Sequence, residues 1–275
     1  MQIEVIIEKK SHKLDAEEGK TILETLQEHG IHVLTAPCGG RGRCGKCTVE
    51  VEHMGEVLAC MTKVTDGMRI TIPKVQLRAQ KSKIAENGTV THYPADDGEG
   101  LDAACDIGTT TVVCHLIDGK TGEKLATVSE PSAQRSFGAD VLSRIQAAEA
   151  GKLEILKEQI IFQIAQMLRT LQKKTGRGEQ IQRLAVVGNT VMCHLFAGIS
   201  PVSIGVTPFM PQEFFGKEYT GEQLGLTDCR SVYIAPAVAG FVGGDITSDL
   251  LAVMQKNPKE KVLLLDIGTN GEMAV

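Results

Sequence analysis

Four cysteines within 23 residues constrain this chain more than any other feature of its sequence. They follow the pattern C-x5-C-x2-C-x12-C, and the first three lie on a single loop, CGGRGRCGKC; the four are Cys38, Cys44, Cys47 and Cys60. Residues 1–20 have charges where a signal peptide has an apolar core, which predicts a cytoplasmic protein. In that compartment cysteine clusters bind metal or perform redox chemistry more often than they form disulfides. The fold around this loop has to bring four thiols together.

The loop favours a [2Fe–2S] cluster as the occupant of these thiols. Its first three cysteines are not arranged in the paired CxxC knuckles typical of structural zinc, and the fourth comes from a separate element, as in plant-type ferredoxins. The loop glycines let the backbone approach a cluster closely and turn N–H groups towards its sulfurs; they are Gly39, Gly40, Gly42 and Gly45. A tetrahedral zinc ion remains the alternative.

Three cations lie in the same loop, at Arg41, Arg43 and Lys46. An anionic cluster gains a further negative charge on reduction, so nearby cations favour the reduced form. We therefore expect these residues to raise the reduction potential and to help dock an acidic partner. In the alternative interpretation they are solvated loop charges.

Residues 1–75 are predicted to form a small α+β domain of the β-grasp type. Residues 2–8 alternate like a strand and can pair with the segment after them, a short helix begins near Thr21, and two strand-like pieces follow at 48–54 and 68–73. A domain of this size commonly needs a staple such as a metal. Residues 76–100 are polar and weakly patterned, which predicts a linker.

From residue 101 the pattern changes to alternating strands and amphipathic helices, so 101–275 is predicted to be α/β. Strands are expected at 103–117 and 123–129, a helix at 153–171, and buried strands at 184–188, 231–238 and 261–268.

The sequence D-I-G-T occurs twice in this second part, at Asp106 and at Asp266, each time after an apolar strand. A glycine two residues on permits a tight hairpin, and the following hydroxyls and backbone N–H groups suit phosphate; the residues concerned are Gly108, Thr109 and Thr110, and Gly268, Thr269 and Asn270. The two acids are the catalytic candidates, because a carboxylate beside a phosphate site holds Mg²⁺ through water or orients an attacking water. Two ordinary β-turns are the alternative.

Two further glycine-rich junctions, at 186–190 and 240–246, are expected to line the same cleft at helix N-termini. Asp245 and Asp140 suit helix caps as well as functional roles. The remaining cysteines show no ligand spacing and are predicted to be buried small hydrophobic residues, Cys105 and Cys114 on one strand; the others are Cys193 and Cys229.

Taken in order, CGGRGRCGKC, ACDIGTTTVV and LLLDIGTNGE resemble the reductive activators of corrinoid-dependent enzymes, over most of the chain. The resemblance implies a [2Fe–2S] ferredoxin-type domain joined to an actin-like, ribonuclease H-like ATPase domain of the acetate and sugar kinase, chaperone and actin superfamily. It implies ATP-linked, one-electron reduction of a Co(II) corrinoid to Co(I). A corrinoid protein and an upstream electron donor are the implied partners, and ATP with Mg²⁺ is the second cofactor.

Such an ATPase domain has two similar lobes, whereas here the second phosphate hairpin begins at Asp266 and the chain ends at Val275. We therefore expect a truncated chain, with the second lobe only begun, in which these 275 residues alone bind little or no ATP.

Composition excludes other classes of protein. A net charge of −5 and the absence of Trp argue against a nucleic-acid binder, and no apolar run reaches the length of a membrane span. Two functions remain as alternatives: a plain ferredoxin-like carrier whose α/β part docks without nucleotide, and a zinc-stabilised binding protein. The oligomeric state, a homodimer included, is left open.

Overall fold

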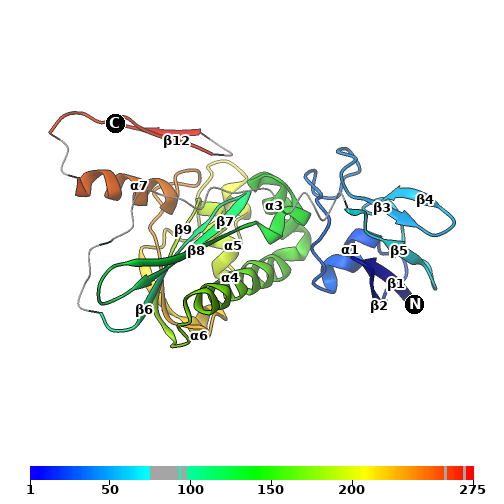
Figure 1. Ribbon diagram of the computed structural model, residues 1–275. Helices are drawn as coiled ribbons and strands as arrows, with labels where there is room; N and C mark the ends of the chain where they lie inside the picture. The colour runs from blue at the N-terminus through cyan, green and yellow to red at the C-terminus, as the bar shows by residue number, and fades with distance from the viewer. Residues whose placement is uncertain (75–92, 94–97, 257–258, 269–270) are drawn as a thin grey trace. The chain divides into compact units, whose positions relative to one another are not determined.

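The computed structural model describes residues 1–74, 93, 98–256, 259–268 and 271–275. The chain divides into two compact units, each described separately below. The first comprises Met1–Lys83 and Ala133–Ala147, and the second Ile84–Ser132 and Ala148–Val275. Figure 1 shows the elements of both.

The first unit is built on a five-stranded mixed sheet in the order β2-β1-β5-β3-β4. Its strands are β1 (Gln2–Ile7), β2 (Lys10–Asp15), β3 (Thr48–Val51), β4 (Gly55–Leu58) and β5 (Arg69–Thr71). β1 and β2 form the expected hairpin, and β1 also pairs parallel to β5. A parallel pair needs a long crossover between its strands, and here the crossover contains the helix and the cysteine loop. This arrangement is of the predicted β-grasp type.

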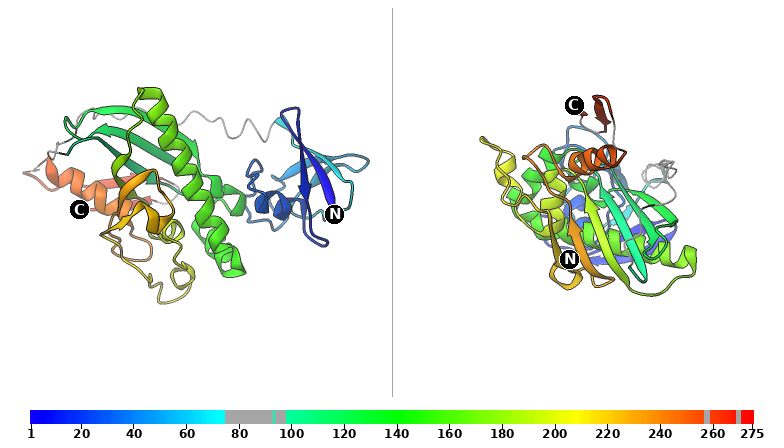
Figure 2. Two further views of the ribbon diagram at one scale, coloured as in Figure 1. Left: turned by 90° about the horizontal axis from the view of Figure 1, so that it is seen from below. Right: turned by 90° about the vertical axis from the view of Figure 1, so that its left-hand side faces the viewer.

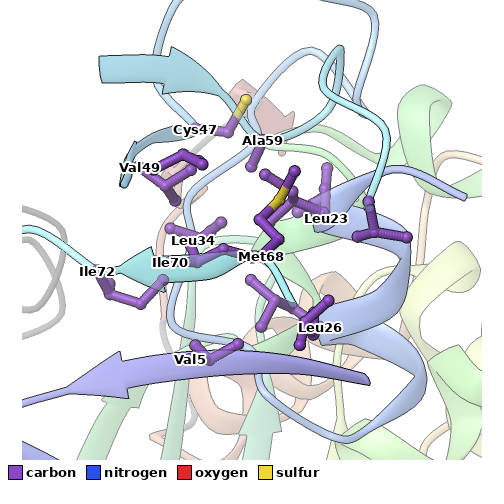
Figure 3. Packing of buried hydrophobic residues seen from close by; sticks show 14 of the residues in the cluster. Val5, Leu23, Leu26, Leu34, Cys47, Val49, Ala59, Met68, Ile70 and Ile72 are labelled. Atoms are coloured by element: carbon purple, nitrogen blue, oxygen red, sulfur yellow. The ribbon is translucent and has the colours of Figure 1, made fainter. Parts of the chain in front are cut away.

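Helix α1 (Ile22–Glu28) begins where the sequence predicted. Thr21 caps it, because its hydroxyl accepts from the N–H of Glu24 while the Glu24 carboxylate accepts from the N–H of Thr21. Leu23 and Leu26 of the helix pack over the sheet with Val5 and Ile70 (Figure 3). Cys47 and Cys60 belong to this core, so the hydrophobic packing also fixes two of the four thiols.

A short 3-10 helix (Ala133–Phe137) and α3 (Val141–Ala147) also belong to this unit. The Asp140 carboxylate accepts from the N–H of Ser143 at 2.7 Å, as a cap of α3 does.

The second unit contains a six-stranded sheet in the order β10-β11-β9-β6-β7-β8. Its strands are β6 (Leu101–Ile107), β7 (Thr111–Asp118), β8 (Lys124–Pro131), β9 (Ile181–Val187), β10 (Lys217–Thr220) and β11 (Cys229–Ile234). β6, β9 and β11 are parallel neighbours, whereas β6, β7 and β8 form an antiparallel meander. The expected single strand at 103–117 is therefore wrong: the turn at Gly108 folds it into two strands.

Among the described residues, four helices accompany this sheet: α4 (Leu153–Thr175), α5 (Thr190–Ala197), α6 (Gly221–Leu224) and α7 (Gly244–Gln255). A short, kinked π-helix at Ala148–Lys152 precedes α4, and a short 3-10 helix lies at Val202–Ile204. α4 is the helix predicted from its apolar spacing, and it packs on β7, β8 and α5 (Figures 1 and 2). Its buried Leu156, Ile160 and Ile164 lie one helical turn apart.

The chain ends in a separate two-stranded sheet of β12 (Leu264–Ile267) and β13 (Gly271–Ala274). The sequence predicted a buried strand here, but Leu265 and Ile267 are exposed, at 51% and 86%. The prediction of burial is wrong. An apolar sequence shows only that a strand is able to pack against another element, and whether such an element lies there depends on the rest of the fold.

Three further points compare the sequence predictions with the structure. The sequence missed β4, a four-residue strand after the turn at 52–54. Most of the predicted linker at 76–100 lies outside the described residues. In the described part of the chain, no helix is both long and apolar enough to span a membrane.

Candidate functional site

The structure brings the four cysteines of the first unit together as two pairs. Cys38 is hydrogen-bonded to Cys44, and Cys60 to Cys47. The pairs adjoin each other, because the loop that carries Cys38 and Cys44 also reaches Cys60: the N–H of Gly42 donates to the Cys60 sulfur, and a Cβ on Gly40 would lie 3.8 Å from Cβ of Cys60. A [2Fe–2S] cluster takes four thiolates over its two irons, so two adjoining pairs suit it.

The hairpin of β3 and β4 explains the Cys47–Cys60 pair. Thr48 lies opposite Leu58 in the register, so Cys47, just before β3, faces Ala59, just after β4. The N–H of Ala59 donates to the carbonyl of Cys47 at 2.9 Å. Cys60 is the next residue, and the sheet thereby brings together two cysteines that are 13 positions apart in the sequence.

Backbone N–H groups of the loop point at the sulfurs. Burial opposes ionisation of Cys38, but hydrogen bonds from the Cys44 thiol and from loop N–H groups outweigh it and lower the pKa of Cys38 to about 6. Those N–H groups belong to Arg41, Arg43 and Cys44. A donor set of this kind stabilises negative charge on sulfur, so the loop fits an anionic cluster.

In the second pair, the effects on the thiol pKa have the opposite balance. Burial, followed by the hydrogen bond and the charge of Cys47, raises the pKa of Cys60 to about 12, and the N–H of Gly42 partly offsets this. The conformation of Gly42 requires glycine: its φ is +71°, and a Cβ there would lie 2.7 Å from Sδ of Met61. The predicted role of the loop glycines therefore has a structural basis at this position.

The cations Arg41, Arg43 and Lys46 are exposed on the loop. Changing all three to Gln should lower the reduction potential of the cluster, on the order of 10–40 mV for each charge, because an exposed charge contributes ~0.2–1 kcal/mol. Redox titration followed by visible absorption measures the shift.

The matched control changes Lys9, Lys10 and Lys13 to Gln, which removes the same total charge. These residues lie on the β1–β2 hairpin, whose β2 is at the opposite edge of the sheet from β4. Equal shifts in the two triple variants would mean that only net charge matters and that the loop cations have no special role.

In the second unit, the first D-I-G-T sequence forms the tight hairpin between β6 and β7. A Cβ on Gly108 would lie 2.6 Å from the carbonyl oxygen of Thr111, so only glycine fits the turn. Thr109 is buried and Thr110 is exposed, and the carbonyl of Thr110 accepts from the N–H of Ser132 at 2.9 Å.

The other two glycine-rich junctions meet this hairpin. Nδ2 of Asn189 donates to Oγ1 of Thr109 at 3.0 Å, while Oδ1 of Asn189 caps α5. A Cβ on Gly243 would lie 2.5 Å from Cα of Asn189, and the N–H of Asp245 donates to the carbonyl of Gly188 at 3.3 Å. Sequence reasoning placed these junctions together but missed Asn189 as the link; its position just before an apolar helix is a helix-cap signal.

Acidic side chains gather beside the hairpin. Although Asp106 is exposed, the surrounding protein removes enough of its hydration to raise its pKa to about 7, with further contributions from the charges of Asp245, Asp266 and Asp249. Loss of hydration also raises the pKa of Asp245, Asp249 and Glu272. The sequence did not single out Asp249 or Glu272. Nor is Asp245 the cap of α7, because Gly243 occupies that position.

The second D-I-G-T sequence is only partly described. Asp266 and Gly268 are described, whereas Thr269 and Asn270 lie outside the described residues. Within the described chain, no three His, Cys, Asp or Glu side chains form a group that could hold one metal ion. An ion beside these acids would therefore take most of its ligands from water or from phosphate.

The four remaining cysteines are buried, as predicted. Cys193 adjoins His194, whose Nδ1 bonds to the carbonyl of Thr190 at 2.8 Å and whose Nε2 accepts from the N–H of Glu213 at 3.3 Å. Both ring nitrogens are thereby used within the core. Cys105 and Cys114 lie opposite each other on β6 and β7 and not on one strand, because the hairpin separates them.

This fold and thiol loop define an iron–sulfur protein of the ferredoxin type, and residues 4–74 match the 2Fe-2S iron-sulfur cluster binding domain. Residues 101–257, more than half of the chain, match the RACo middle region. The chain therefore belongs to the family of corrinoid reductive activators, as its sequence motifs indicated.

The chain is similar to two curated relatives. It is 28% identical to the "Corrinoid activation enzyme RamQ" of Eubacterium limosum, over 88% of this chain and 54% of that protein. It is 27% identical to the "[Co(II) methylated amine-specific corrinoid protein] reductase" of Methanosarcina barkeri, over 62% of this chain and 33% of that protein. The chain thus spans about half the length of the first relative and a third of the second.

A solved structure, the "Reductive activator for corrinoid,iron-sulfur protein", is 26% identical and superposes with a TM-score of 0.60, covering 98% of this chain and 61% of that one.

Proposed function

We propose that this chain is the electron-transferring part of an ATP-linked reductive activator that converts an inactive Co(II) corrinoid to Co(I). The two adjoining thiol pairs at Cys38, Cys44, Cys47 and Cys60, set in a loop of N–H donors, are the observation that carries the proposal. The names of the similar proteins support the choice of a corrinoid protein as the partner.

The four cysteines would hold the cluster, and a bound [2Fe–2S] cluster supplies one-electron chemistry. The N–H groups of Arg41, Arg43 and Gly42 stabilise negative charge on sulfur, which favours the reduced state. Residues 1–75 would form the ferredoxin-type domain, residues 76–100 the linker, and residues 101–275 the first, actin-like lobe of the ATPase domain.

The nucleotide would bind at the two hairpins in the protein extended by a second lobe. Gly108, Thr109 and Thr110 offer backbone and hydroxyl groups to phosphate, as would Gly268, Thr269 and Asn270 of the second hairpin. Asp106 and Asp266 would act on Mg²⁺ or on the attacking water, with the metal bound mainly by water and phosphate.

ATP would have a thermodynamic role in this reaction. Plant-type clusters have reduction potentials of about −400 mV, and reducing a Co(II) corrinoid from such a donor is unfavourable. The equilibrium constant falls by a factor of ten for every ~59 mV of difference in potential. A nucleotide shifts this equilibrium only if it binds two states of the complex with different affinities.

The direct test mixes the chemically reduced protein with a Co(II) corrinoid protein and follows Co(I) by its absorption. The chain with its cluster should produce Co(I), and the Cys44→Ala variant should produce none. In the extended chain ATP should increase the yield, and Asp106→Ala should abolish that increase without changing cluster reduction. Co(I) formation that does not depend on ATP would indicate a plain electron carrier, and a colourless protein that contains zinc would overturn the proposal.

A further inference from the structure

Two buried thiols face each other between neighbouring strands of the second unit. Cys105 of β6 lies directly opposite Cys114 of β7, and their Sγ atoms are 2.6 Å apart. The two side chains are only 1% and 0% exposed. Because a disulfide bond is about 2.05 Å long, the sulfurs lie roughly half an ångström from bonding distance.

The strand pairing also suits a bond between these sulfurs. The N–H of Gly119 donates to the carbonyl of Gly100 at 2.9 Å, which marks these two residues as a hydrogen-bonded pair. Pair types alternate along an antiparallel ladder, so Cys105 and Cys114, five positions further along, form a non-hydrogen-bonded pair. The Cα atoms of such a pair are about 4.5 Å apart, within the range that disulfides accept. The bond would therefore require no change of register.

We propose that Cys105 and Cys114 are an oxidation site, at which a small-molecule disulfide converts the two thiols into a disulfide across β6 and β7. One cysteine thiolate attacks the external disulfide, forms a mixed disulfide and releases one external thiolate. The second cysteine then attacks the mixed disulfide at the first cysteine's sulfur and releases the other external thiolate. The two cysteines lose two electrons and two protons in total, and the external disulfide becomes two thiols.

Burial makes this reaction slow in both directions. It raises the pKa of Cys105 well above its usual range, so the attacking thiolate is scarce. The same burial shields the finished bond from reductants. The site is distinct from the cluster cysteines, which lie in the other unit, and the inference does not depend on the proposed function.

The bond would tie together the two strands that present the D-I-G-T hairpin. Asp106 directly follows Cys105, and the closed loop contains residues 106–113. Closing this loop restricts the unfolded chain, so the oxidised protein should melt at a higher temperature, by roughly 5 °C.

The digestion pattern of the chain permits a direct test. Residues 84–120 have no internal Lys or Arg, follow Lys83 and end at Lys120, and contain only these two cysteines. The chain with its cluster is incubated anaerobically with oxidised glutathione, at 25 °C and also in urea just below the unfolding transition, so that slow opening does not limit the reaction. It is then denatured in iodoacetamide and digested with trypsin.

We expect the peptide 84–120 to have no alkylated cysteine and to be lighter by about 2 Da, the mass of the two hydrogens lost. Reduction should restore both thiols. Cys114→Ser should abolish the cross-link and the rise in melting temperature while leaving the visible spectrum of the cluster unchanged. Cys193→Ala, a buried cysteine on α5, should leave the cross-link intact. Two alkylated cysteines in this peptide under both conditions would overturn the proposal.

Discussion

Replacing Cys44 with Ala is expected to remove the iron–sulfur cluster and to destabilise the whole first unit. The variant loses one of the two thiol pairs and the S–H donor of Cys44 that acts on Cys38, while the backbone N–H of residue 44 remains. Metal binding and folding are coupled in small domains, since the site does not exist in the unfolded chain. We expect the iron content to fall from two per chain to nearly zero, the visible spectrum to vanish, and this unit to melt tens of degrees lower.

The matched control is Cys193→Ala in the second unit. The Cys193 thiol is also buried, and it donates to the carbonyl of Gly188 at 3.4 Å, so this variant tests loss of a core thiol without loss of a cluster ligand. Its iron content should equal that of the parent. Two irons per chain in the Cys44→Ala protein would show that the ligand set has been assigned incorrectly.

The second large effect concerns Asp106, where we expect Asp106→Asn to stabilise the protein and to inactivate it. The pKa of this carboxyl is raised from 3.8 to about 7, by lost hydration and then by neighbouring acids. Between about pH 4 and 7 the folded state therefore binds more protons than the unfolded state, and stability falls as pH rises through this window. Asparagine removes this penalty.

The variant should therefore melt above the parent at pH 8, and the difference should disappear below about pH 4. The carboxyl is exposed, so solvent screens part of the effect, and we expect ~1 kcal/mol, or about 2–4 °C. In the chain extended by a second lobe, the same substitution should abolish ATP hydrolysis. A gain in stability together with a loss of activity is typical of a residue kept for function.

Asp118→Asn is the control of opposite sign. The N–H of Thr121 and then the guanidinium of Arg177 lower the pKa of Asp118, so its charge stabilises the fold above about pH 4. This variant should lose stability where Asp106→Asn gains it. If Asp106→Asn instead melts below the parent at pH 8, the folded protein stabilises the charged carboxylate, and the neighbouring acids do not destabilise it.

The sequence was most informative where one physical requirement acts over a short range. The spacing of the cysteines and the glycines between them predicted a thiol loop with N–H donors, because the covalent chain alone keeps Cys38 near Cys44. The periodicity of α4 and the start of a short helix near Thr21 are equally local, and both predictions are confirmed by the structure.

The rest depended on partners that are distant in the sequence. The D-I-G-T pattern predicted a tight hairpin at Gly108, but the strand expected at 103–117 continued through it because apolar residues lie on both sides; composition does not show that the carbonyl of Thr111 approaches Gly108 so closely. Asp249 and Glu272 join the acidic group only because α7 and the final hairpin approach Asp106. The prediction that Ile267 is buried was wrong for the same reason, since exposure depends on which surface packs against a strand.

The register of β3 and β4 has a consequence for how this kind of cluster protein can vary. The 12 residues between Cys47 and Cys60 are the two strands, their turn and Ala59, so the spacing measures the length of a hairpin. Adding one residue to each strand next to the turn keeps Cys47 opposite Ala59 and on the same face, whereas a one-residue shift of only one strand turns every later side chain to the other face. Insertions that preserve the pairing can therefore change the interval freely and leave the cluster in place. A search for distant homologues that fixes the interval at 12 would miss them, whereas one that allows any intact hairpin between the third and fourth cysteines would find them.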